Sequence, residues 1–134
     1  MSATIIEVII PMKPVAKERP RSGAGKFYTP KKTHSAERTI GLLVSNKMKV
    51  NGIRSIETGP VKVTALFSFN IAGTKKQGCW KATRPDVDNL GKTVLDALNG
   101  VAFKDDGQVA EFICRKKFSN EDSVTVRIES LQAA

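Results

Sequence analysis

Acidic residues are concentrated in one short part of a chain that is otherwise strongly basic. Asp86, Asp88, Asp105 and Asp106 all lie within residues 86–106, whereas the whole chain carries a net charge of +9. Carboxylates held close together repel one another unless a cation lies among them. Oxygen-only ligand sets suit Mg²⁺ or Mn²⁺. We therefore expect the chain to fold an acidic metal site into a basic surface, a combination suited to hydrolysis of a nucleic-acid phosphodiester.

The size and composition of the chain predict one globular domain, residues 1–134. At 134 residues with 40% hydrophobic side chains, a single core is expected. Cys79 and Cys114 are too few for a disulfide framework, and there is no Cys/His zinc pattern, so the cytoplasm is the expected location. No apolar run is long enough to span a bilayer. The excess of 22 basic over 13 acidic residues favours a polyanionic partner, with a merely soluble basic surface as the alternative.

The hydrophobic pattern predicts an α+β domain with the element order βαβαββ. Two helices are expected to cover one face of a small mixed sheet, giving two layers. Prolines and glycines in residues 11–32 predict a long irregular loop, which is basic. The expected strands are 4–10, 61–71, 108–118 and 123–131, the last two joined by a hairpin turn at 120–122, and the expected helices are 33–49 and 88–98.

The residues at the start of the second helix have both structural and functional interpretations. Asp88 is expected at the first helical position or the N-cap, where its carboxylate can satisfy free N–H groups. Asp86 needs a further explanation, because one carboxylate is enough for the cap. Lys92 lies four residues after Asp88 on the same face, so it either forms a helical ion pair or contacts a phosphate. For Asp96, four residues further, the ion pair is the preferred interpretation.

Asp105 and Asp106 precede a glycine, and Asp-Asp-Gly is typical of a turn. The short connection after the second helix can also bring this turn beside the start of the same helix, or beside a symmetry mate. Asp106 would then supply a third carboxylate, and Asp105 a further ligand or a base that orients water.

Three motifs resemble the RusA-type Holliday junction resolvases over nearly the whole chain. They are Asp86-Val87-Asp88-Asn89-Leu90-x-Lys92, Leu95-Asp96-Ala97-Leu98-Asn99-Gly100 and Asp105-Asp106-x-Gln108-Val109, with weaker similarity at Lys17-x-Arg19-Pro20-Arg21 and Tyr28-Thr29-Pro30. The resemblance implies that Asp86, Asp88 and Asp106 bind the metal and that Lys92 is essential, and Asp105 matches an acidic residue next to the third metal ligand.

The resemblance also implies the substrate and the assembly. Members are homodimers that bind four-way DNA junctions and nick two opposing strands symmetrically with Mg²⁺ or Mn²⁺, in DNA recombination and repair. It implies a bacterial cytoplasmic enzyme, with chromosome, prophage and phage left open as its source.

Basic residues of the long loop are the expected contacts to DNA phosphates. Tyr28 is a candidate stacking group, and Trp80 either stacks on an unpaired base or is a partly buried aromatic. Two other functions stay open: a nuclease for flaps, forks or branched intermediates of phage DNA processing, and a basic nucleic-acid-binding module without catalysis. The expected DNA-binding residues are Lys17, Arg19, Arg21, Lys26, Tyr28 and Lys31.

Overall fold

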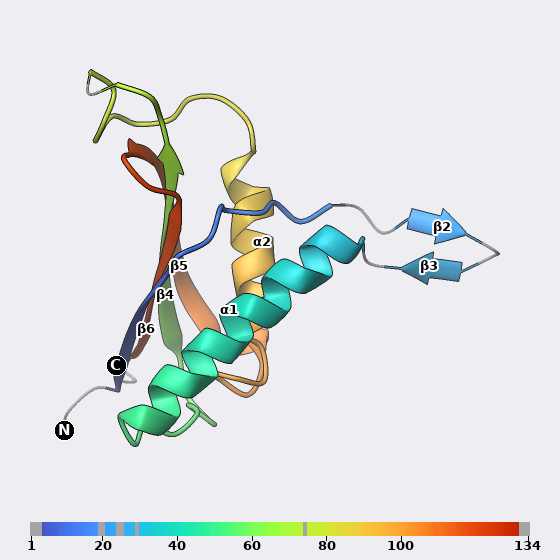
Figure 1. Ribbon diagram of the computed structural model, residues 1–134. Helices are drawn as coiled ribbons and strands as arrows, with labels where there is room; N and C mark the ends of the chain where they lie inside the picture. Colours follow the sequence, from blue (N-terminus) through green and yellow to red (C-terminus); the bar gives the residue numbers. More distant parts are fainter. Residues whose placement is uncertain (1–3, 19–20, 24–25, 29, 74, 132–134) are drawn as a thin grey trace.

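The computed structural model describes residues 4–18, 21–23, 26–28, 30–73 and 75–131, with the backbone alone for 21–23 and 26–28. A four-stranded sheet forms one layer, and two α-helices form the second layer on one face of that sheet (Figure 1). This confirms the predicted two-layer α+β domain. The elements are β1 (Ile5–Ile10), β2 (Arg21–Gly23), β3 (Lys26–Tyr28), α1 (Lys31–Val50), β4 (Val61–Asn70), α2 (Val87–Leu98), the 3₁₀ turn η1 (Asp106–Gln108), β5 (Val109–Ser119) and β6 (Ser123–Ser130).

The sheet is mixed, as predicted, with the strand order β1-β6-β4-β5. Strands β4 and β5 are parallel, and the other neighbours are antiparallel. The expected hairpin between the last two strands is wrong, because β4 lies between β5 and β6. Residues 120–122 instead cross the end of β4, where Asp122 Oδ1 accepts a hydrogen bond from the N–H of Asn70 (2.8 Å). Alternation fixes which face of a strand is buried but does not choose its partner strand.

The core lies between the sheet and the helices. In β4 every second residue from Val61 to Phe69 is buried, which is the pattern of a strand with one face against a core. The helices complete this core with apolar residues three and four positions apart, which lie on one face of each helix. These buried residues are Ile40, Val44 and Met48 from α1 and Leu90, Val94 and Leu98 from α2.

Two glycines allow α2 to pack closely against its neighbours. A Cβ on Gly91 would lie 2.8 Å from Phe112 Cε2 and 3.0 Å from Cys114 Sγ, both on β5. On α1, a Cβ on Gly41 would lie 3.1 Å from the backbone oxygen of Ala97 in α2. The absence of side chains at these points brings α2 against both β5 and α1, and so fixes where the N-terminus of α2 lies.

The expectation of an irregular loop is wrong for residues 21–23 and 26–28, which form the antiparallel strands of the β2–β3 hairpin. Arg21 pairs with Tyr28, and Gly23 pairs with Lys26. Figure 1 shows this hairpin standing out from the sheet and the helices, before the start of α1. Strands of three residues give little periodic signal, and the surrounding prolines and glycines hide them.

Candidate active site and nucleic-acid interface

Asp86 and Asp88 lie at the N-terminus of α2. Asp86, rather than Asp88, is the N-cap residue, with φ −71° and ψ 138°, because the helix begins one residue earlier than expected. The Asp86 side chain makes no cap hydrogen bond, and both aspartates are exposed. The cap interpretation therefore does not account for the Asp86 carboxylate. Two carboxylates at a helix N-terminus are also favoured by the positive end of the helix dipole.

Lys116 on β5 supports the segment that leads into Asp86. Its ammonium group donates hydrogen bonds to the backbone oxygens of Thr83 and Pro85, each at 2.8 Å. The peptide bond between Arg84 and Pro85 is cis. Lys116 pairs with Phe67 in the register of β4 and β5, so it occupies an inward-facing position of β5. No role for Lys116 was predicted from the sequence, although a lysine at an apolar position of an alternating strand was a signal for it.

Lys92 is exposed on α2, one turn after Asp88. The ion pairs among the described residues do not join Lys92 to Asp88 or to Asp96. The simple helical ion pair is therefore absent within 4.0 Å, and Lys92 is an exposed residue one turn after Asp88. This arrangement is compatible with a contact to a phosphate group.

Lys17 ties the two helices together. Its Nζ lies 2.9 Å from Glu37 Oε1 on α1 and 2.7 Å from Asp96 Oδ2 on α2, and its N–H donates to the backbone oxygen of Asn89 at 2.8 Å. Burial acts to lower the pKa of Lys17, but the hydrogen bonds and charges of Asp96 and Glu37 outweigh it and raise the pKa above 10.5. The helical ion pair expected for Asp96 is wrong, because Asp96 pairs with Lys17 from a distant part of the chain and not with Lys92. Because two carboxylates share the Lys17 ammonium group, Lys17 is less available to bind a DNA phosphate group than the sequence indicated.

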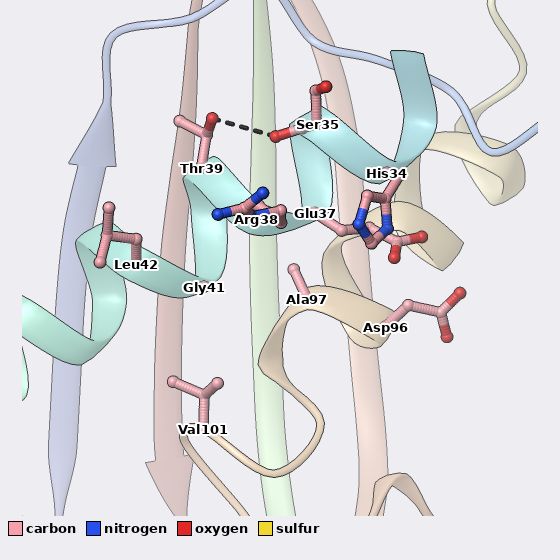
Figure 2. A pocket seen from close by; sticks show the side chains of 10 residues that line it. All are labelled: His34, Ser35, Glu37, Arg38, Thr39, Gly41, Leu42, Asp96, Ala97 and Val101. Atoms are coloured by element: carbon pink, nitrogen blue, oxygen red, sulfur yellow. Dashed lines mark hydrogen bonds between the residues drawn. The ribbon is translucent and has the colours of Figure 1, made fainter. Parts of the chain in front are cut away.

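The same two carboxylates border a hollow of about 660 Å³ between α1 and α2. Figure 2 shows Asp96 and Ala97 on one wall and residues of α1 from His34 to Leu42 on the other. Asp86, Asp88 and Asp106 do not line it. Asp86 instead lines a separate, smaller hollow of about 370 Å³ at the N-terminus of α2, together with Ala16, Arg84, Pro85 and Asn89.

Asp105 and Asp106 lie at the other end of α2. The N–H of Asp106 donates to Oδ1 of Asn99, the C-cap residue of α2, at 3.0 Å. Asp105 Oδ2 accepts from the N–H of Gly107 at 2.9 Å, so Asp105 acts as a cap for η1, as the turn interpretation anticipated. Gln108 completes this capping box by accepting from the N–H of Asp105 at 3.0 Å. It also donates to the backbone oxygens of Ile56 and Gly59, so the turn is firmly held.

The carboxylates are thus divided between the two ends of one helix. A helix of 12 residues is about 18 Å long, so Asp106 lies far from Asp86 and Asp88 in the same chain. Within the part of the chain that the structure describes, no group of three His, Cys, Asp or Glu residues could hold a metal ion. Each end supplies oxygen ligands suited to Mg²⁺ or Mn²⁺, but one protomer alone brings only two of the three predicted ligands together.

The predicted DNA-binding residues fall in and around the β2–β3 hairpin. Arg21, Lys26 and Tyr28 are on its two strands, and Lys31 is the first residue of α1 and is exposed. Arg19 lies outside the described residues. The hairpin therefore carries three of the predicted contacts away from the body of the domain.

Fold and site together define a basic α+β protein with carboxylates at both ends of one helix. Residues 11–129 match the family model of endodeoxyribonuclease RusA, and the chain belongs to that family. The family indicates a nuclease with Holliday junction resolvase activity, and such nucleases are generally metal-dependent. None of the helices in the described residues is long and apolar enough to cross a membrane.

Two relatives are similar to this chain. The uncharacterized protein YqaN of Bacillus subtilis strain 168 is 34% identical over 136 residues, covering 90% of this chain and 93% of YqaN. The crossover junction endodeoxyribonuclease RusA of Lactococcus phage r1t is 29% identical over 70 residues, covering 52% of this chain and 53% of the phage protein.

Proposed function

We propose that this protein is a Mg²⁺-dependent endodeoxyribonuclease that resolves four-way DNA junctions by paired nicking in recombination and repair, with Mn²⁺ able to replace Mg²⁺. The observation that carries the proposal is the exposed pair Asp86 and Asp88 at the N-terminus of α2, where the Asp86 carboxylate is not used as a cap. Two carboxylates one residue apart repel each other, and a bound cation would relieve that repulsion. Membership of the RusA family supports the same conclusion.

The proposed roles follow from where each side chain lies. Asp86, Asp88 and Asp106 would hold the metal, which when bound supplies charge neutralisation at the scissile phosphate and an activated water. Lys92 is on the face of α2 that carries Asp88, where its ammonium group would stabilise the negative charge that develops on the phosphate. Asp105 would act as a positioning residue, because its cap on η1 sets the direction of Asp106.

We infer that the metal site is completed by a second copy of the chain. The positions of Asp86 and Asp106 at opposite ends of α2 support this, because a twofold axis that passes beside the middle of α2, at a right angle to the helix, would pack the two α2 helices antiparallel and bring their opposite ends together. Asp106 of the partner subunit would then lie beside Asp86 and Asp88. A C2 homodimer built in this way has two equivalent sites, which is what two nicks in opposing strands require.

Binding of DNA would rest on the hairpin and on residues near it. Arg21, Lys26 and Lys31 would contact phosphates, and Tyr28 would lie against a sugar or a base. Lys17 would act mainly by holding α1 and α2 together, because Glu37 and Asp96 already share its charge. Arg19 remains a predicted phosphate contact.

The test is incubation with a labelled immobile four-way junction, in Mg²⁺ or in EDTA, beside linear duplex, flap and fork controls. We expect paired nicks in opposing strands, only with the metal and mainly on the junction. Preferential cutting of flaps or forks would replace junction resolution with general branch cleavage. Binding without any cutting would reject the enzyme and leave a binding module.

A further inference from the structure

Trp80 is the single tryptophan of the chain, and it is 64% exposed. The structure thus excludes the partly buried aromatic that the sequence left open. The residue does not sit on a loose loop, because its segment adds a short stretch of pairing to the edge of β5. The backbone N–H of Lys81 donates to the backbone oxygen of Lys116 at 3.0 Å, and the N–H of Phe118 donates to the backbone oxygen of Cys79 at 2.9 Å. Between them, Trp80 forms an antiparallel bridge with Lys117. A large apolar ring is therefore held rigidly in solvent.

The surroundings of the ring are cationic. The Nζ of Lys117 lies 4.4 Å from the centre of the Trp80 ring, which is a cation–π contact. Residues 71–85 contain no aspartate or glutamate. Four basic residues in and next to this segment take part in none of the ion pairs among the described residues, so their charge is available to an anionic partner. These residues are Lys75, Lys76, Arg84 and Lys117. The ammonium group of Lys81 lies over the rings of Phe69 and Phe118 and donates to the Thr83 hydroxyl.

The ring lies close in the fold to the acidic end of α2. Lys116 donates to the backbone of Thr83 and Pro85, directly before Asp86, and the next residue of β5, Lys117, contacts Trp80. Successive residues of a strand point to opposite faces, so Trp80 and Asp86 lie on the two sides of the same sheet edge. A DNA strand that reaches Asp86 can therefore continue around this edge to Trp80.

We propose that Trp80 and Lys117 form a stacking platform for an unpaired nucleobase of the DNA strand that runs past Asp86. The inference rests on the proposed function, because it takes branched DNA as the substrate. An exposed ring stacks on any base, and the lysines attract the phosphates on either side of it. Bases at a branch point are open to stacking, whereas those within a continuous duplex are not. The platform therefore selects for the branch point itself.

The single tryptophan makes the platform directly observable. Tryptophan emission is recorded while the wild-type protein, in EDTA to prevent cleavage, is titrated with a four-way junction or with a linear duplex of the same sequence. In parallel, the anisotropy of a dye on the DNA reports binding without reference to Trp80. We expect saturable quenching with the junction and much less with the duplex. Trp80→Ala should bind the junction about 10-fold more weakly, whereas Trp80→Phe should keep most of the affinity.

Each other outcome has a defined meaning. Junction binding by anisotropy without a change in emission, and with Trp80→Ala as tight as wild type, would overturn the platform and leave the proposed function intact. Absence of junction binding by anisotropy would overturn both. Sedimentation of the proteins without DNA measures their oligomeric state, and so tests whether Trp80 packs against a second copy of the chain instead of a base. A dimer that dissociates in Trp80→Ala but not in Lys76→Met would assign Trp80 to the subunit interface and overturn the proposal.

Discussion

Two inactive variants should regain activity when they are mixed, if the metal site is shared between subunits. Asp86→Asn removes a ligand at the N-terminal end of α2, and Asp106→Asn removes one at the other end. In a heterodimer of the two variants, one shared site has lost both aspartates and the other site retains both. Neither substitution should disturb folding, because the Asp86 side chain makes no cap bond and Asp106 uses its backbone N–H to bind Asn99.

The expected recovery can be calculated from the twofold symmetry. An equal mixture with free exchange contains about one half heterodimers, each with one intact site of two, so about one quarter of the wild-type sites return. Cleavage of a four-way junction should rise from background to about that fraction, with single nicks in place of paired ones. The measurement is the initial rate of nicking after co-refolding, with heterodimers confirmed by native mass spectrometry.

A matched pair of variants provides the control. Asp86 and Asp88 lie on the same end of α2, so a mixture of Asp86→Asn with Asp88→Asn leaves every site with one ligand missing and should stay inactive. If Asp86→Asn and Asp106→Asn also stay inactive while heterodimers are present, the site is not shared between subunits in the way proposed.

Three further predictions test the supports of the site. Lys17→Met should lower the free energy of unfolding by about 1 kcal/mol at neutral pH. Because the pKa of Lys17 is raised in the folded state, this stability difference should persist up to pH 10.5 and disappear as the pH rises through the raised pKa. Urea unfolding of the wild-type protein and the variant at several pH values measures the difference. A difference that grows with pH would contradict the prediction. Lys116→Met should reduce the affinity for metal about 10-fold or more, by releasing the segment before Asp86, with little change in the Kd for the junction. An equal loss in both would assign Lys116 to DNA binding. Burial raises the pKa of Cys114 to about 11, so iodoacetamide at pH 8 should alkylate exposed Cys79 first. In Cys79→Ser, the rate at which Cys114 is alkylated should increase about 10-fold per pH unit towards pH 11, and mass spectrometry can follow this rate. Rapid alkylation of Cys114 at pH 8 would refute the raised pKa.

The features that the sequence predicted correctly are local ones. Alternation in residues 61–69 and three- and four-residue spacing in both helices depend on neighbours in the chain, so the elements and their buried faces could be predicted. The closeness of Asp86 to Asp88 is also local, because one residue separates them.

The features that it did not predict depend on contacts between distant residues. The insertion of β4 between β5 and β6 is one example, since nothing within residues 120–122 indicates it. The pairing of Lys17 with Glu37 and Asp96 is another, because it joins three separate parts of the chain. The place of Asp106 was left open between two alternatives, and the bond from its N–H to Asn99 is inconsistent with the one that put it beside the start of the same helix. The alternative with a symmetry mate stays a prediction.

The central claim is that a dimer with two metal sites cuts both strands of a junction in one encounter. A supercoiled plasmid that extrudes a cruciform tests it most directly, because two nicks across the junction give linear DNA and a single nick gives a relaxed circle. With Mg²⁺ the wild-type protein should convert the plasmid to the linear form, and EDTA or Asp86→Asn should abolish the reaction. Relaxed circles as the only product, or linear DNA formed equally well in EDTA, would contradict the claim.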